Sequence, residues 1–282
     1  MDPFAAVGAS LHPLEGGWSG ETFLAQAGGE RSVVRLFAHP RHPVEAAQIQ
    51  ASLLRLVRGL VPAPEVLEVR RADPAAGLPA LLVTQWLPGT RLDLILPTLD
   101  DTGQHRVGEA VGRLVGTLGG MPFLHHGLFT DGDLHLAPFT RPEEQSLGEV
   151  GERARALLDT EGRACLVHSD LSPQNLLVDP ETLAVTGLVD WELAHAGHPF
   201  TDLGSVLRFE RQPAYVAGVL QGYAALRGTD PDRALELARC ADLSALAELA
   251  ARAGENPVAD RAAQRLEAIL AAGDVHAVED PV

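Results

Sequence analysis

Two short segments of this 282-residue chain, Leu166–Val178 and Leu188–Glu192, restrict its fold more than any others. In the first, Asp170 and Asn175 stand five positions apart, and Asp190 follows fifteen positions later. Two carboxylates and one carboxamide are thus expected on short loops flanked by apolar, strand-like residues. Such a set suits phosphoryl transfer from a nucleotide. One carboxylate orients and deprotonates a hydroxyl, and an amide oxygen and a second carboxylate hold the metal on the phosphates.

A simpler interpretation is that these polar side chains only close turns, as Asp and Asn often do. That interpretation would be sufficient for a single residue. The turn interpretation is disfavoured here, because the residues form one ordered pattern. The pattern is His-x-Asp-x-x-x-x-Asn, followed by a strand and then by Asp-Trp-Glu. We therefore predict that Asp170 accepts the hydroxyl proton, and that Asn175 and Asp190 offer the oxygen ligands that Mg²⁺ prefers.

The N-terminal part of the chain is predicted to be rich in strands. Leu14–Leu24 holds three glycines and a serine between extended segments, and Arg31–Phe37 is a β-branched run that would pair with it. Glycine allows the close backbone approach that a phosphate needs, although a glycine-rich tip is often only a turn. Apolar residues at helical spacing predict a helix over Pro43–Leu60. Val66–Val69 and Ala80–Gln85 predict two further strands.

The remainder is predicted to be mainly helical, with a loop-rich stretch over residues 121–146. Trp86–Gly89 breaks the last N-terminal strand, so we place a boundary there, with residues 1–88 in one lobe and residues 89–282 in the other. The helices expected beyond the boundary are His105–Leu118, Leu147–Leu158, Asp202–Phe209, Ala214–Leu226, Pro231–Ala253 and Pro257–Ala271.

The charge of the chain narrows the choice of partners. It has 22 Lys and Arg against 38 Asp and Glu, a formal net charge of −16. Such a surface repels nucleic acid and anionic membranes, so neither is expected, whereas a cationic small molecule is a better match. A plainer interpretation is that the charge only confers solubility. No signal peptide and no long uninterrupted apolar run is evident, so a cytoplasmic protein is expected.

His168–Asn175, together with Val189–Glu192, resembles the aminoglycoside phosphotransferase family, and His198–Leu203 is similar to the stretch that follows the metal-binding Asp in that family. The resemblance is specific over residues 166–204 and looser over residues 14–95. It implies an α+β, bilobal, protein-kinase-like fold, in which an N-terminal lobe has an antiparallel sheet and one main helix and a larger C-terminal lobe is mostly helical. It also implies an ATP or GTP donor, Mg²⁺ and a hydroxyl acceptor.

The resemblance implies a role for each matching residue of this sequence. Asp170 would be the catalytic base, Asn175 and Asp190 would hold Mg²⁺, and Glu192 would lie near the metal and the acceptor. Two further residues would support the catalytic loop without touching the acceptor: His168 and Asp202. On the nucleotide side, a glycine-rich loop would cover the triphosphate, and the chain after the last strand would offer backbone groups to the adenine. The residues concerned are Ser19, Gly20, Gln85 and Leu87.

One position departs from the family pattern. The family usually has a lysine on the strand after the glycine-rich loop, where it binds the α- and β-phosphates, and this chain has Arg35. Arginine stays charged and can fork onto phosphate, so phosphate binding can survive the change. Its carboxylate partner on the next helix would be Glu45, the only acid between Glu30 and Glu65. The alternative is that Arg35 is a strand residue that points to solvent.

Acidic residues gather where this family builds its acceptor site: Asp131, Asp133, Glu143, Glu144, Glu149, Glu152 and Glu192. Together with the net charge they favour a cationic acceptor. We therefore predict an O-phosphotransferase that inactivates an antibiotic, either an aminoglycoside or a basic cyclic peptide of the capreomycin and viomycin kind, and so confers antibiotic resistance. Two alternatives stay open. One is a metabolic kinase acting on an amino alcohol, homoserine or a sugar, and the other is a nucleotide-binding pseudokinase.

Overall fold

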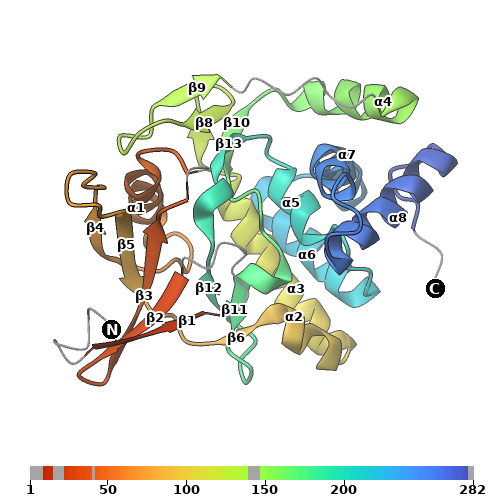
Figure 1. Cartoon of the computed structure of the whole chain (residues 1–282). Coiled ribbons are helices and arrows are strands. Elements are labelled where there is room, and N and C mark those ends of the chain that lie inside the picture. Colours follow the sequence, from red (N-terminus) through yellow and green to blue (C-terminus); the bar gives the residue numbers. More distant parts are fainter. Residues whose placement is uncertain (1–8, 15–21, 40–41, 139–146, 279–282) are drawn as a thin grey trace.

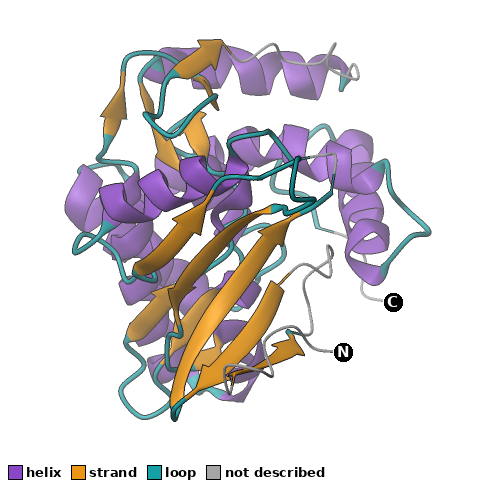
Figure 2. Cartoon of the chain, turned by 60° about the vertical axis from the view of Figure 1, so that its left-hand side comes forward, coloured by secondary structure: helices purple, strands orange, loops and turns teal. Residues whose placement is uncertain are grey.

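The computed structural model describes residues 9–14, 22–39, 42–138 and 147–278. A strand-rich N-terminal part is followed by a mainly helical part, which confirms the expected α+β architecture (Figure 1). Seen from a second direction, the N-terminal sheet lies in front of the helices (Figure 2). None of the helices among the described residues is long and apolar enough to cross a membrane.

The N-terminal part is a five-stranded antiparallel sheet with the strand order β1-β2-β3-β5-β4. Helix α1 packs against β4 and β5, and most of its apolar residues are buried, Leu53 and Val57 completely, whereas Leu56 is exposed. This burial follows from the helical spacing of the apolar residues, which gives α1 one continuous apolar face. The bounds are β1 (Ala9–Pro13), β2 (Thr22–Ala27), β3 (Glu30–Phe37), α1 (Ala46–Val57), β4 (Val66–Arg70) and β5 (Ala80–Gln85).

Two smaller antiparallel sheets carry the polar loops of the motif. One has the order β12-β11-β6 and lies between the N-terminal sheet and the helices (Figure 1). The other has the order β7-β10-β13-β8-β9. Their strands are β6 (Thr90–Arg91), β7 (Pro122–Phe123), β8 (Gly127–Phe129), β9 (Leu136–Pro138), β10 (Ala164–Val167), β11 (Leu176–Val178), β12 (Val185–Leu188) and β13 (His195–Gly197).

Each helix expected in the second part is present, although the ends differ in places. The helix expected over His105–Leu118 begins at Asp101, and the one expected over Pro231–Ala253 ends at Ala250. The helix expected over Asp202–Phe209 ends at Val206, and the stretch 121–146, expected to be loop-rich, contributes three short strands. The α-helices are α2 (Leu92–Ile95), α3 (Asp101–Leu118), α4 (Gly148–Leu158), α5 (Thr201–Val206), α6 (Pro213–Arg227), α7 (Pro231–Ala250) and α8 (Pro257–Ala272). The 3₁₀ helices are η2 (Leu96–Thr98), η3 (Asp159–Glu161), η4 (Pro173–Asn175) and η5 (Trp191–Leu193).

Glycines bring α3 and α6 into close backbone contact. A Cβ atom added at Gly112 of α3 would lie 2.0 Å from the carbonyl oxygen of Val219, and one added at Gly222 of α6 would lie 2.1 Å from the carbonyl oxygen of Glu109. Only glycine fits at such distances, because any side chain would overlap the facing backbone. The two helices therefore form a closely packed pair beneath the site.

We expect Gly112→Ala to lower the free energy of unfolding by about 1–3 kcal/mol, because the added methyl group forces α3 and α6 apart. Thermal and urea unfolding of the purified variant measure this loss. Gly162→Ala is the matched control, since its added Cβ meets nothing within 4 Å and its φ of −60° suits alanine. Equal stability of the two variants would contradict the close contact.

Candidate active site

The loop that carries Asp170 is fixed by one buried carboxylate. The backbone N–H groups of His168 and Ser169, just beyond β10, donate to the two oxygens of Asp202 at 2.9 and 2.8 Å. Asp202 lies in the first turn of α5 and is 2% exposed. Burial raises the pKa of Asp202 to about 6, although the two N–H groups favour its charged form. Ser169 has a φ of 69°, so the chain turns sharply here before Asp170.

His168 joins this loop to the next one. Its buried ring donates from Nε2 to the carbonyl oxygen of Val189 at 3.0 Å and meets the edge of Trp191, with ring centroids 4.8 Å apart. Trp191 in turn donates from Nε1 to the carbonyl oxygen of Leu188 at 2.9 Å. Burial lowers the pKa of His168 to about 4, so the imidazole is neutral near pH 7. His168 thus occupies a supporting position behind the loops.

Asn175 touches Asp170 directly. Its Nδ2 group donates to the Asp170 side chain at 2.9 Å and to the Asp170 backbone carbonyl at 2.8 Å. The carboxamide oxygen Oδ1 accepts no hydrogen bond from any residue that the structure describes. Burial, and then the charge of Asp190, raise the pKa of Asp170. The pair thus consists of a carboxylate with raised basicity and an amide oxygen that is free to accept.

Asp190 lies on the next loop, after β12. Its φ of 66° is in the left-handed region, where the chain turns into η5, and its side chain is 37% exposed. The preceding residue, Val189, donates its N–H to the backbone carbonyl of Asn175 at 3.0 Å, so the two loops are held side by side. The oxygens of Asn175 and Asp190 are of the types that Mg²⁺ takes, and this donor set fits the ion.

Arg35 reaches this site from the N-terminal sheet. It lies on β3 opposite Thr22 of β2 and Leu82 of β5, so it occupies the interior of the sheet. Its Nη1 donates to Asp190 Oδ1 at 2.8 Å, and its Nη2 forms an ion pair with Glu192. The Arg35 side chain is only 13% exposed, so the alternative of a strand residue pointing to solvent is excluded.

The structure corrects the expected pairing of Arg35 with Glu45. Glu45 lies at the N-cap of α1 and forms an ion pair with Arg71, with Nη1 and Oε1 2.6 Å apart. Its other oxygen accepts the backbone N–H of Gly132 at 3.1 Å, and Ser52 of α1 donates to the carbonyl oxygen of Gly132 at 2.6 Å. Glu45 therefore attaches the beginning of α1 to the turn between β8 and β9. Its carboxylate is occupied by Arg71 and Gly132 and does not pair with Arg35 of β3.

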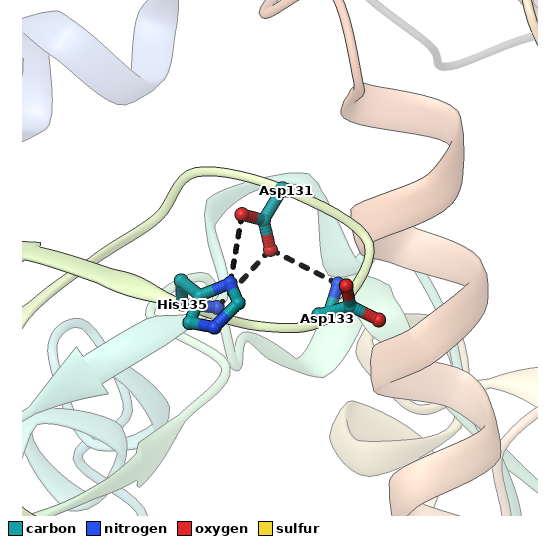
Figure 3. Close-up of side chains that lie close together, drawn as sticks. All are labelled: Asp131, Asp133 and His135. Carbon is teal, nitrogen blue, oxygen red and sulfur yellow. Dashed lines mark hydrogen bonds and ion pairs between the residues drawn. The ribbon is translucent and has the colours of Figure 1, made fainter.

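Asp131 and Asp133 lie in that same turn (Figure 3). The Asp131 carboxylate accepts the backbone N–H of Asp133 at 3.0 Å and contacts His135 Nδ1 at 2.9 Å. This hydrogen bond with His135 lowers the pKa of Asp131 and raises that of His135. Possible ligand atoms of these three residues lie within 4.8 Å of one another. Asp131 shapes the turn, whereas the Asp133 side chain is exposed and free to meet a ligand.

The acids expected around the acceptor are not brought together as one group. Glu149 is exposed in the first turn of α4, and Figure 1 shows α4 at the edge of the molecule, away from β11 and β12. Glu143 and Glu144 lie outside the described residues. Glu192, by contrast, lies next to Asp190 through their shared contact with Arg35.

Of the residues expected on the nucleotide side, Ser19 and Gly20 lie outside the described part of the chain. Gln85 is the last residue of β5 and is exposed, and its N–H donates to the carbonyl oxygen of Glu65 at 2.8 Å. Leu87 follows in the connection to β6, where its backbone makes no hydrogen bond with other described residues. The backbone of Leu87 is therefore more available to a ligand than that of Gln85.

Sequence reasoning missed a buried ion pair behind Asp170. Arg208 follows α5 and Asp242 lies in α7, and both are less than 10% exposed. Arg208 donates from Nε and Nη2 to both oxygens of Asp242, at 2.7 to 3.0 Å. Its positive charge also acts on Asp170, whose pKa it lowers against the effect of burial. The two residues are 34 positions apart, so no local pattern indicates the pair.

We expect the stability advantage of the wild type over His168→Asn to shrink by roughly 2 kcal/mol between pH 7.5 and pH 5. The reason is that the folded pKa of His168, about 4, lies below the unfolded value of 6.5. The unfolded chain therefore binds a proton in this window that the folded chain does not, and the wild type loses stability as pH falls. Urea unfolding at both pH values measures the difference. A constant difference would show that His168 titrates normally.

Comparison with known proteins gives the family and the fold. The model of the phosphotransferase enzyme family matches residues 10–237. The solved structure of a microcompartment-associated aminopropanol kinase is 20% identical with a TM-score of 0.64, and the alignment covers 95% of this chain and 94% of that one. The GDP complex of aminoglycoside 2'-phosphotransferase-IIIa is 18% identical with a TM-score of 0.64, and the alignment covers 94% of this chain and 93% of that one. Choline kinase LicA from Streptococcus pneumoniae is 16% identical with a TM-score of 0.60, and the alignment covers 93% of this chain and 94% of that one. These likenesses show the protein-kinase-like fold.

Curated relatives match over a shorter segment. Acyl-CoA dehydrogenase family member 11 of Mus musculus is 35% identical over 66 residues, which are 23% of this chain and 8% of that protein. The protein of the same name from Rattus norvegicus is 34% identical over 68 residues, which are 24% of this chain and 9% of that protein. These relatives are thus matched over less than a tenth of their length. The family model, in contrast, covers most of the chain, which therefore belongs to the phosphotransferase enzyme family.

Proposed function

We propose that this protein transfers the γ-phosphoryl group of ATP or GTP to a hydroxyl of a small cationic molecule. The observation that carries the proposal is the meeting of four side chains. Asp170, Asn175 and Asp190 lie on adjoining loops, and Arg35 reaches Asp190 from the N-terminal sheet. Membership of the phosphotransferase enzyme family supports the type of reaction.

Asp170 is the group that accepts the hydroxyl proton. Its pKa is raised by burial and by the charge of Asp190, which makes it a stronger base than an ordinary aspartate. Asn175 holds the Asp170 side chain through Nδ2, so the carboxylate is oriented before an acceptor arrives. The neutral, buried His168 takes no part in proton transfer.

Mg²⁺ would be held by Asn175 Oδ1 and Asp190. An ion that is bound by one or two protein oxygens and by substrate phosphates needs few protein ligands, and this site offers that number. When bound, the ion would offset the negative charge on the phosphate oxygens. The chain itself fixes the two ligands relative to each other through the hydrogen bond from Val189 N–H to the Asn175 carbonyl.

The nucleotide would lie between the N-terminal sheet and these loops. Arg35 supplies a positive charge for the phosphates, and the backbone of Leu87 supplies hydrogen-bonding groups for the base. Ser19 and Gly20 would cover the triphosphate, and Gln85 would border the base. A GDP complex exists for one solved relative, so both ATP and GTP are candidate donors for this chain.

The acceptor is proposed to be cationic. The net charge of −16 favours it, and Glu192 and Asp133 are the exposed or half-exposed acids that could meet it. Antibiotic inactivation is the first candidate, since solved relatives include complexes with kanamycin and gentamicin. The second candidate is an amino alcohol, because other solved relatives are named aminopropanol kinase and choline kinase. Both candidates combine a hydroxyl with a positive charge.

A panel of acceptors tests the proposal. The purified protein is given Mg²⁺ and either ATP or GTP, together with aminoglycosides, capreomycin, viomycin, aminopropanol, choline, homoserine and neutral sugars. Phosphorylation of an antibiotic supports the first candidate, and phosphorylation of amino alcohols alone supports the second. Turnover of neutral sugars only would overturn the cationic acceptor. Nucleotide binding without turnover of any acceptor would favour a pseudokinase.

We expect Asp170→Asn to reduce kcat by about 10²–10⁴-fold, since a general base contributes that much, while nucleotide affinity stays close to that of the wild type. Single-turnover phosphoryl transfer and nucleotide titration measure the two quantities separately. Asp232→Asn, an exposed change of the same chemistry on α7, is the control and should behave as the wild type. An Asp170→Asn enzyme with full activity would remove Asp170 from the role of base.

A further inference from the structure

Arg35 is the cation that faces the Asp190 and Glu192 carboxylates in this structure. One guanidinium nitrogen bonds to each, and among the residues described no other cation pairs with either acid. All three side chains are partly withdrawn from water, with exposed fractions of 13% for Arg35, 37% for Asp190 and 30% for Glu192. Ion pairs at such positions are stronger than those on an open surface.

The site needs a cation because its negative charges are crowded. Asp190 and Glu192 are two positions apart, and both act electrostatically on Asp170. Three carboxylates that repel one another are thus held on adjoining loops, and Arg35 offsets part of this repulsion from across the site. A divalent ion bound at Asp190 would do the same. Arg35 and the ion therefore compete for one carboxylate.

A bound phosphate would offer Arg35 hydrogen bonds that it lacks in this structure. Its Nε atom is buried and has no hydrogen-bond partner in the described part of the chain. An unmade hydrogen bond of a buried charged group is costly. Arginine presents its donors in a planar fork that suits phosphate oxygens, so a triphosphate would give Arg35 new partners as it leaves Asp190.

We infer that Arg35 neutralises the Asp190–Glu192 pair before nucleotide binds, and that divalent metal binding is therefore conditional on nucleotide. This inference rests on the proposed nucleotide and metal site. A bound triphosphate would draw Arg35 away from Asp190, and the Asp190 carboxylate would then be available to hold the ion. Because coupling between two ligands is reciprocal, the metal also raises the affinity for nucleotide. Arginine at this position differs from lysine, since the guanidinium presents a separate nitrogen to each carboxylate, whereas all the donors of a lysine ammonium lie on one atom.

Binding of Mn²⁺ tests the inference without any turnover. Free Mn²⁺ is measured by electron paramagnetic resonance in titrations of the wild-type protein, with and without the β,γ-methylene analogue of whichever nucleotide, ATP or GTP, the protein binds. We expect weak binding of Mn²⁺ alone, and binding at least about ten-fold tighter with the nucleotide analogue, which lies within the usual range of coupling between two sites. Equal Mn²⁺ affinity with and without the analogue would overturn the inference.

Three variants identify Arg35 as the cause. Arg35→Gln should bind Mn²⁺ alone about ten-fold more tightly than the wild type and should lose most of the gain from the nucleotide analogue. Arg35→Lys should fall between the two, and it also tests the inference if the glutamine variant folds poorly. Arg70→Gln removes an exposed arginine from β4 of the same sheet and should match the wild type. Wild-type values in both Arg35 variants would overturn the inference.

Asp190→Asn separates this inference from the proposed function. If the wild type binds Mn²⁺ with the analogue and Asp190→Asn does not, the metal site stands whatever the Arg35 variants do. If the wild type binds no Mn²⁺ under either condition, the metal site and the inference both fail. If Mn²⁺ binds normally and Arg35 has no effect, only the inference fails.

Discussion

Two hydrogen bonds to a single buried carboxylate hold the rest of the site in place. Asp202 accepts the backbone N–H groups of His168 and Ser169 and so attaches the loop that carries Asp170 to α5. Helix α5 itself lies close against α7, because a Cβ atom at Gly204 would be 2.4 Å from the carbonyl oxygen of Ala238. The position of Asp170 is therefore set by the helical core, and the short strands beside it need little stability of their own.

The charges of the site are balanced from two sides. Arg35 of the N-terminal sheet faces Asp190 and Glu192, and Arg208, fixed by its ion pair in the helical core, acts on Asp170. Each arginine comes from a part of the chain remote from the acids it faces. Partly buried charges need such partners, because burial disfavours the charged form of a carboxylate and a nearby positive charge favours it. The site depends on both parts of the molecule being in contact.

The sequence was sufficient for most helices, because their apolar spacing is long enough to be recognised. The fold class followed from the resemblance of the polar motif to a known family. The sequence also indicated Asp170, Asn175 and Asp190, whose roles remain predictions, because their chemistry stands in one short ordered pattern. Strands β7, β8 and β9 were missed, since strands of two or three residues show no period. β7 and β8 also pair with β10 and β13, which lie far along the chain, whereas β9 pairs with the neighbouring β8. The predicted Arg35–Glu45 pair was wrong because the position of Glu45 in the sequence does not reveal the direction of its side chain. Glu45 precedes the first residue of α1, and its carboxylate contacts Gly132.

The backbone contacts of Gly132 bear on how such an enzyme can change through mutation. Both its N–H and its carbonyl are held by α1, through Glu45 and Ser52, so the backbone of the β8–β9 turn has a fixed distance from the N-terminal sheet. The exposed side chain of Asp133 next to it makes no such attachment. Mutations at this tip can therefore change its charge and shape while its backbone stays in place. The charge of this turn and the geometry of the loops around Asp170 can therefore change independently of each other.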